Sequence, residues 1–208
     1  MNKNTIFTML GGLTFWAAAT AAATADARTD LAHLHPGLDS RPPIGWVQFC
    51  AQNPVECRTA PGGSDKVALS ERSWRELVDV NLRFNKAIAP MTDQEQYGVP
   101  ERWTYATTGQ GDCEDYVLEK RRELAKRGWP LSALLITVVL DKEGGGHAVL
   151  TVMTDRGEFV LDNQTDVIHR WSESGLTFIK RQSPRNPNAW LDLGRILGRP
   201  EVVTATIR

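Results

Sequence analysis

The sequence predicts an α+β domain in which helices pack on an antiparallel sheet. Apolar residues follow helical spacing over about 70–89 and again over about 112–127. Short β-branched strands separated by tight turns come after them, between Leu134 and Gln182. Helices first and an antiparallel meander afterwards are typical of the α+β class.

The size and charge of the chain narrow the functional classes. Its 208 residues suffice for one domain with a real core and are too few for two ordinary domains. The net charge is -1, and no long basic run is present. We therefore expect no binding to nucleic acid.

The first 27 residues read as a secretory signal peptide. Lys3 is the only basic residue before Arg28, and the uncharged segment 6–25 ends in the small-x-small pattern Ala25-Asp26-Ala27. An uncleaved membrane anchor is the alternative, because about 20 apolar residues can span a bilayer. We expect residues 28–208 to form a single exported domain in an oxidising compartment.

Three cysteines fit such a compartment. Cys50 and Cys57 flank Asn53-Pro54, and a turn there favours a local disulfide, with two independent buried thiols as the alternative. Cys113 is then left over. An odd thiol in a secreted protein is an intermolecular linker or a reactive group.

Before the first long helix, the chain reads as irregular. Pro42-Pro43 indicates an extended arm over 28–45, Ile44 to Cys57 reads as a turn-rich segment, and residues 60–64 read as a loop. The helix over 70–89 has Ser70 as its N-cap and ends before Pro90.

Two asparagines, Asn81 and Asn85, interrupt the apolar stripe of that helix. We expect them to hydrogen-bond in the core or to a neighbouring loop. A long connection over 91–111 follows, and long ordered loops in compact domains tend to be functional. The second helix starts near Asp112 and stops at Gly128.

The strands are predicted from β-branched runs and turn residues. They cover Leu134–Leu140, His147–Thr154, Glu158–Asp162 and a short fourth strand at Phe178–Gln182, with a hairpin at Asp155-Arg156-Gly157. The C-terminal tail carries only weak helix and strand signals.

Cys113 is the candidate nucleophile. It follows Gly109 and Gly111 and lies in the first turn of a predicted helix, where free backbone N–H groups and the helix dipole stabilise a thiolate. The glycines allow close approach of a substrate. The alternative is a buried structural cysteine.

A thiolate needs a base, and the base needs an orienting group. His147 opens a strand at the sheet end, and Asp162 ends the next strand of the same hairpin, so the two should lie near each other. Asn163 is the alternative orienting residue, and a satisfied structural histidine is the alternative for His147. Cys113, His147 and Asp162 together predict a catalytic triad.

The sequence also resembles a known family, the bacterial transglutaminase-like cysteine proteinases. The resemblance covers most of the predicted mature chain and is carried by these motifs: Gly111–Tyr116, Gly146–Leu150, Val160–Asn163, Pro43–Trp46 with Phe49-Cys50, Pro54–Cys57, Val80-Asn81, Arg181–Ser183 and Trp190. It implies a papain-like/transglutaminase-like core and maps the family triad onto Cys113, His147 and Asp162.

The family resemblance implies more than the triad. Its best-understood members are periplasmic proteases that clip large surface adhesins, bind calcium beside the nucleophile and are sequestered by an inner-membrane cyclic-di-GMP receptor. Asp112 and Glu114 match the positions of the calcium ligands, and Asp115 is adjacent. Nothing in the sequence calls for an organic cofactor.

The acids around Cys113 provide a physical reason for calcium binding. Asp112, Glu114 and Asp115 would raise the pKa of the Cys113 thiol by like-charge repulsion, and a bound Ca²⁺ would remove that repulsion. Alternatively, the acids only complement the dipole at the helix N-terminus.

The oxyanion hole is less defined. The Cys113 backbone N–H is one natural donor, with Gln110 and the segment 103–105 as candidates for a second. Trp46, Trp103 and Trp129 are expected to pack in the core.

We therefore expect a periplasmic cysteine endopeptidase. One alternative is a transglutaminase, which uses the same triad and passes the acyl group to an amine. The other is a non-catalytic adaptor that binds a membrane receptor, although such a module would not need all three triad residues.

Overall fold

The computed structural model describes residues 33, 34, 36–59 and 64–194. The predicted signal peptide, residues 1–27, lies outside the described residues, as does most of the loop predicted at 60–64. Among the described helices, none is long and apolar enough to cross a membrane.

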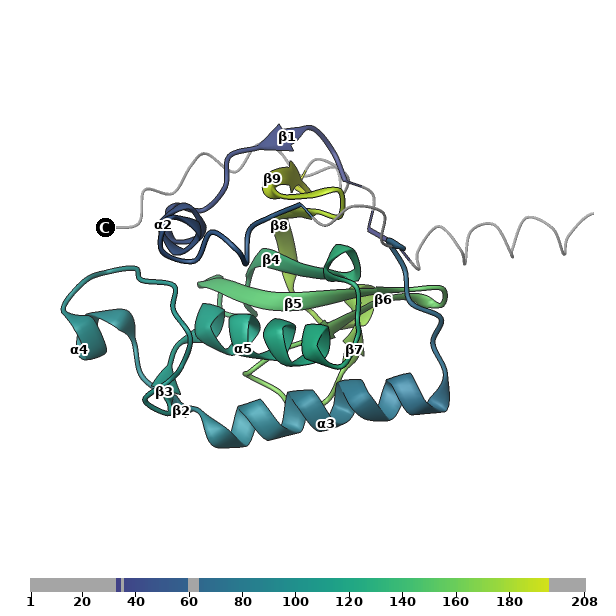
Figure 1. Cartoon of the computed structure of the whole chain (residues 1–208), viewed down its shortest axis with the longest axis horizontal. Coiled ribbons are helices and arrows are strands. Elements are labelled where there is room, and N and C mark those ends of the chain that lie inside the picture. Colours follow the sequence, from purple (N-terminus) through teal and green to yellow (C-terminus); the bar gives the residue numbers. More distant parts are fainter. Residues whose placement is uncertain (1–32, 35, 60–63, 195–208) are drawn as a thin grey trace, which may run out of the picture.

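A seven-stranded antiparallel sheet forms the centre of the described chain, in the order β1-β9-β8-β4-β5-β6-β7 (Figure 1). Its strands are β1 (Asp39–Ser40), β4 (Leu134–Leu140), β5 (Gly146–Thr154), β6 (Gly157–Leu161), β7 (His169–Arg170), β8 (Thr177–Ser183) and β9 (Asn186–Asp192). The four predicted strands and the α+β class are confirmed. β9 was missed, because the tail segment Asn186–Asp192 has few apolar residues and a proline.

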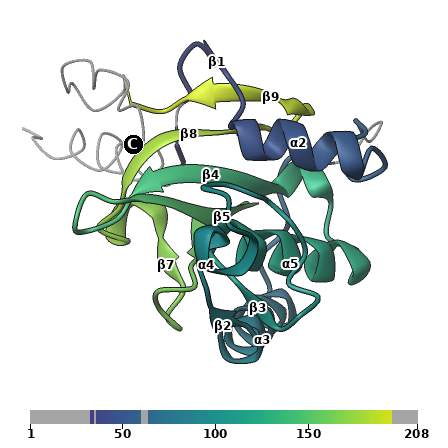
Figure 2. The ribbon, with the colours of Figure 1, turned by 90° about the vertical axis from the view of Figure 1, so that its left-hand side faces the viewer.

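Two long helices cover one face of the sheet. α5 (Cys113–Lys126) lies against the sheet, and α3 (Glu71–Ala87) packs on α5 from the other side (Figures 1 and 2). Both helices were predicted. Ser70 caps α3 as expected, and Gly128 ends α5 with a positive φ of 90°.

The segment Ile44–Cys57, predicted to be turn-rich, is instead largely helical. It contains α2 (Ile44–Gln52), whose Trp46 and Phe49 are almost fully buried. Gly45 lowers helix propensity, but a Cβ there would lie 2.2 Å from the Trp103 ring. Burial of the aromatic side chains therefore stabilises a helix that local propensity does not favour.

The connection 91–111 has structure that the sequence did not predict. A short helix, α4 (Asp93–Tyr97), follows the N-cap Thr92, and β2 (Ala89–Pro90) pairs in parallel with β3 (Gln110–Gly111). Short 3₁₀ turns also occur at Leu131–Ala133 and Trp171–Glu173. The β2–β3 pair brings the two ends of the connection together, and with them the start of α4 and the start of α5.

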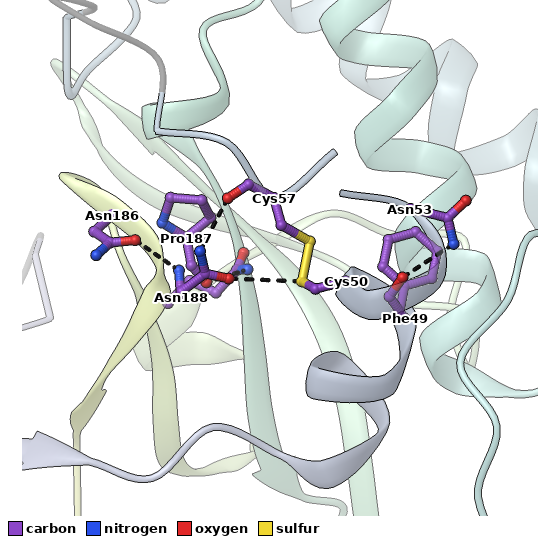
Figure 3. Close-up of a disulfide and its surroundings, with 8 residues drawn as sticks. Phe49, Cys50, Asn53, Cys57, Asn186, Pro187 and Asn188 are labelled. Atoms are coloured by element: carbon purple, nitrogen blue, oxygen red, sulfur yellow. Dashed lines mark hydrogen bonds between the residues drawn. A yellow bond between two sulfur atoms is a disulfide. The ribbon is translucent and has the colours of Figure 1, made fainter. Parts of the chain in front are cut away.

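The predicted disulfide joins Cys50 in α2 to Cys57 in the following turn, with a Cα–Cα distance of 5.6 Å (Figure 3). Asn188 of β9 donates a hydrogen bond from Nδ2 to the Cys57 carbonyl at 3.0 Å. Its Oδ1 also lies 3.6 Å from the Cys50 sulfur. These contacts of Asn188 hold the disulfide, and with it the end of α2, beside β9.

Candidate active site

Cys113 is the first residue of α5, and Asp112 is its extended N-cap. The helix start faces the opening of β5. Burial and the charge of Glu114 raise the pKa of the Cys113 thiol, and the backbone of Ala148 in β5 partly opposes this increase. The β5–β6 pairing ends at Leu150–Leu161, so this part of β5 is open on its β6 side. The thiol therefore lies next to the residue that follows His147, and it is half-buried.

His147 and Asp162 are in direct contact, as the hairpin geometry predicted. The Nε2 of His147 lies 2.8 Å from the Oδ1 of Asp162, and both side chains are buried. Burial opposes ionisation of Asp162, but hydrogen bonds from His147 and from the N–H of Gln164 keep its pKa below the ordinary value. The neighbouring Asn163 has a buried Oδ1 without a hydrogen-bond partner among the described residues, so Asp162 is the one that engages the ring.

Two side chains of α3 hold the loop that carries Asp162. Asn85 donates to the carbonyls of Asp162 at 3.0 Å and Thr165 at 3.1 Å. Asn81 is fully buried and donates to the carbonyls of Thr165 and Asp166. The expectation that these asparagines hydrogen-bond in the core or to a neighbouring loop is confirmed.

Three acids form a cluster beside Cys113. One carboxylate oxygen from each of Asp93, Asp112 and Glu114 lies within 4.8 Å of the others. The N–H of Asp93 also donates to the Oδ2 of Asp112 at 3.2 Å, which ties α4 to the start of α5. The sequence analysis named Asp112 and Glu114 as candidate ligands, and Asp93 was not among its candidates.

Asp93 had a sequence signal of its own. Thr92 and Glu95 form a reciprocal capping box, the pattern that marks a helix start. It would have revealed α4 and placed an acid in its first turn. Its proximity to Asp112 could not be predicted, because that depends on the β2–β3 pairing.

Asp115, the third predicted ligand, lies outside this cluster. Its Oδ1 accepts a hydrogen bond from the N–H of Thr104 at 2.9 Å, and a Cβ at Gly111 would lie 2.6 Å from its Oδ2. Burial raises the pKa of Asp115 to about 8. Asp115 thus links α5 to the connection 91–111, and its buried Oδ2 has no hydrogen-bond partner within the described part of the chain.

The cluster is electrostatically unfavourable as it stands. Burial, followed by the hydrogen bond and charge of Asp112, raises the pKa of Glu114. Burial and then the charge of Glu114 raise the pKa of the Cys113 thiol. Oδ1 of Asp93 and Oδ1 of Asp112 are buried without a hydrogen-bond partner among the described residues. Such oxygen atoms suit a hard divalent cation.

Some of the candidate donors for the oxyanion hole already make other hydrogen bonds. Gln110 lies in β3, three positions before Cys113, and is half-buried. In the segment 103–105, the indole N–H of Trp103 donates to Glu101 at 2.6 Å and the N–H of Thr104 donates to Asp115. These two donors are therefore already engaged. Trp46, Trp103 and Trp129 are all buried, as expected for packing residues.

Comparisons with known proteins agree with this architecture. The family model described as bacterial transglutaminase-like cysteine proteinase matches residues 37–196. No curated protein sequence matches the chain significantly.

The calcium-bound structure of Legionella pneumophila LapG shares the fold. The calcium-bound form has a TM-score of 0.50 and 24% identity over 62% of this chain and 72% of LapG. A second LapG structure gives 0.48 and 25% over 57% and 67%, and an EGTA-treated form gives 0.49 and 24% over 61% and 69%.

Proposed function

Since the family match spans more than half of its length, the chain belongs to the bacterial transglutaminase-like cysteine proteinases and is a cysteine peptidase, and we propose that Cys113, His147 and Asp162 form its catalytic triad. The observation that carries the proposal is the 2.8 Å contact between His147 and Asp162. His147 directly precedes Ala148, the residue of β5 whose backbone acts on the pKa of the Cys113 thiol.

The geometry supports a defined role for each residue. Asp162 engages the Nε2 of His147, which leaves Nδ1 as the ring nitrogen that exchanges a proton with Cys113. The Cys113 sulfur attacks the peptide carbonyl, and His147 gives the proton to the departing amine as the C–N bond breaks. Water, deprotonated by His147, then hydrolyses the thioester and regenerates the thiol.

We propose calcium as the partner of the acidic cluster. Asp93, Asp112 and Glu114 would hold the ion, because one carboxylate oxygen of each converges. In addition, Asp93 and Asp112 each have a buried Oδ1 without a hydrogen-bond partner among the described residues. A bound divalent cation would offset the negative charge that raises the pKa of Cys113. LapG, which shares the fold, has a calcium-bound structure.

The biological setting is also a proposal. The family resemblance supports a periplasmic enzyme that enters through a cleaved signal peptide and clips a large surface adhesin. A membrane-bound cyclic-di-GMP receptor is the corresponding regulatory partner. The disulfide between Cys50 and Cys57 supports an oxidising compartment.

The test uses purified mature protein and candidate surface adhesins. Wild type should release fragments that Cys113→Ala and His147→Ala do not. His169→Ala is the matched control, because His169 lies in β7 and belongs to no part of the proposed triad. If Cys113→Ala gives the same fragments as wild type, the triad assignment is wrong.

Calcium and the acyl acceptor are tested in the same assay. Chelation with EGTA should abolish cleavage, and added calcium should restore it. Cleavage that is insensitive to EGTA would contradict the calcium assignment. Incorporation of a labelled amine without fragments would instead indicate a transglutaminase, which uses the same triad.

A further inference from the structure

A lysine is completely buried between the two long helices, close to the triad. Lys120 of α5 has no exposed surface, and its Nζ donates to the Oδ1 of Asn81 on α3 at 2.8 Å. The ammonium also lies 5.9 Å from the centre of the Tyr116 ring. A buried lysine is costly, and an apolar side chain would fill this space at lower cost.

The charge of Lys120 faces the loop that follows β6. The carboxylates of Asp162 and Asp166 both favour its charged form, while burial lowers its pKa to about 7. In turn, the ammonium helps to keep the pKa of Asp162 low. The charged or titratable groups around Lys120 are thus Tyr116 on its own helix and Asp162 and Asp166 on the loop, while α3 contributes the neutral Asn81.

Hydrogen bonds also hold the same loop in place. Asn81 accepts from Lys120 and donates to the carbonyls of Thr165 and Asp166, so the lysine, the asparagine and the loop form one hydrogen-bonded unit. Asp162 lies at the start of this loop, next to the end of β6. A displacement of the unit would therefore displace the carboxylate that engages His147.

The proposed catalytic cycle requires a second cation near Asp162. When His147 is protonated, it is the counter-charge of the buried Asp162. When His147 gives up its proton, Asp162 keeps its charge in a buried setting and needs another cation. Lys120 is a buried cation that contributes to the ionisation of Asp162.

We propose that Lys120 is a positioning residue of this peptidase. Its hydrogen bond to Asn81 fixes the 162–166 loop so that His147 stays in one orientation, and in its charged form Lys120 favours the ionised form of Asp162. This inference rests on the proposed triad.

The test compares Lys120→Met with Arg121→Met. Met has nearly the length of lysine without its charge, and Arg121 is an equally buried cation on the same helix, which donates to the Leu134 carbonyl and packs over Trp46. The Asp162 carboxyl is followed by ¹³C NMR against pH, with calcium present and in the Cys113→Ala background. We expect Lys120→Met to raise the pKa of Asp162 by about one pH unit, a typical scale for charges several ångströms apart inside a protein. Arg121→Met should leave it unchanged.

Activity supplies a second readout in proteins that retain Cys113. Lys120→Met should lower kcat about tenfold with little change in KM, and the acid limb of the kcat/KM profile should move to higher pH. Lys120→Gln, which keeps a polar head near Asn81 but no charge, should behave in the same way and replaces Lys120→Met if that variant does not fold.

Two results overturn the proposal. One is a pKa of Asp162 that moves no more in Lys120→Met than in Arg121→Met. The other is a matching loss of kcat in both variants with no movement of the acid limb. Failure of the triad itself is separate, because it would appear as activity in Cys113→Ala while the NMR titration stayed interpretable.

Discussion

The acidic member of the proposed triad is chosen by hydrogen bonding rather than by position in the sequence. Asp162 and Asn163 are adjacent at the end of β6, and either type of side chain can orient an imidazole. Asp162 accepts from His147 and from the N–H of Gln164. The role therefore falls to the carboxylate, which also stabilises a protonated ring.

Substitution of the two neighbours should separate their roles. We expect Asp162→Ala to lower kcat/KM by about 10²-fold or more, because His147 loses its orienting partner. Asn163→Ala should stay within about threefold of wild type. The measurement is steady-state cleavage of the adhesin substrate, with circular dichroism to confirm folding. An equal loss in both variants would argue that the loop, and not the carboxylate, is what matters.

Lys120 should leave a signature in the pH dependence of stability. Its folded pKa is about 7 and its ordinary value is 10.5, so between these values the unfolded chain holds a proton that the native protein has released. Stability should therefore rise with pH through this window, by up to about 1.4 kcal/mol per pH unit. Below pH 7 both states are protonated and the native state bears the full cost of the buried charge.

The measurement is urea unfolding of wild type and Lys120→Met from pH 6 to pH 10. The difference in unfolding free energy between them should favour Lys120→Met at pH 6 and shrink as the pH rises. A difference that does not depend on pH would mean that the lysine titrates normally in the folded protein.

At the scale of secondary-structure elements, the ends of helices and strands position the side chains of the proposed site. α5 presents Cys113 at its N-terminus, β5 presents His147 at its start, and the five-residue helix α4 brings Asp93 to the N-cap of α5. The β2–β3 pair is what joins α4 to α5. An acid in the first turn of α4 thus becomes part of a cluster that otherwise belongs to α5.

Asp93→Asn should weaken calcium binding by about tenfold or more, because a charged ligand becomes a neutral one. Isothermal titration with calcium measures this directly, and the calcium concentration for half-maximal cleavage should rise in parallel. Asp65→Asn, at an exposed acid outside the cluster, is the control and should match wild type. Unchanged affinity in Asp93→Asn would remove Asp93 from the ligand set.

At the scale of the whole molecule, the sheet and the helices form the core, and the disulfide restrains α2. The helices α3 and α5 cover one face of the sheet and build the core beneath the site (Figure 2). α2 packs through Trp46 and Phe49 onto Trp103 and Tyr105, in the connection that leads to the acidic cluster. The disulfide restrains α2 at a distance from the chemistry.

Removal of the disulfide should therefore affect stability more than catalysis. Cys50→Ser with Cys57→Ser should lose about 2–3 kcal/mol of unfolding free energy, since the bridge closes a short loop of seven positions. Cleavage at a temperature where the variant is folded should stay within about twofold of wild type. A large loss of activity in a folded variant would show that α2 also positions the site.

The sequence alone determined the features that depend on local chemistry. The Ser70 cap, the stop at Gly128 and the Asp155–Gly157 hairpin follow from backbone preferences within a few residues, and all are present. Cys113 at a helix start and the contact of His147 with Asp162 were also predictable. The first follows from a helix boundary, and the second from the register of one hairpin.

Tertiary structure decided what depends on residues distant in the chain. Ile44–Gln52 is helical because Trp46 and Phe49 are buried against other parts of the chain, which a local pattern does not reveal. Asp93 joins Asp112 and Lys120 faces Asp162 only because the strands and helices between them fold together. Local preferences act over a few residues, whereas burial and electrostatics act between elements. Cys113 and the adjacent acids Asp112 and Glu114 could therefore be proposed from the sequence, while Asp93 and Lys120 could not.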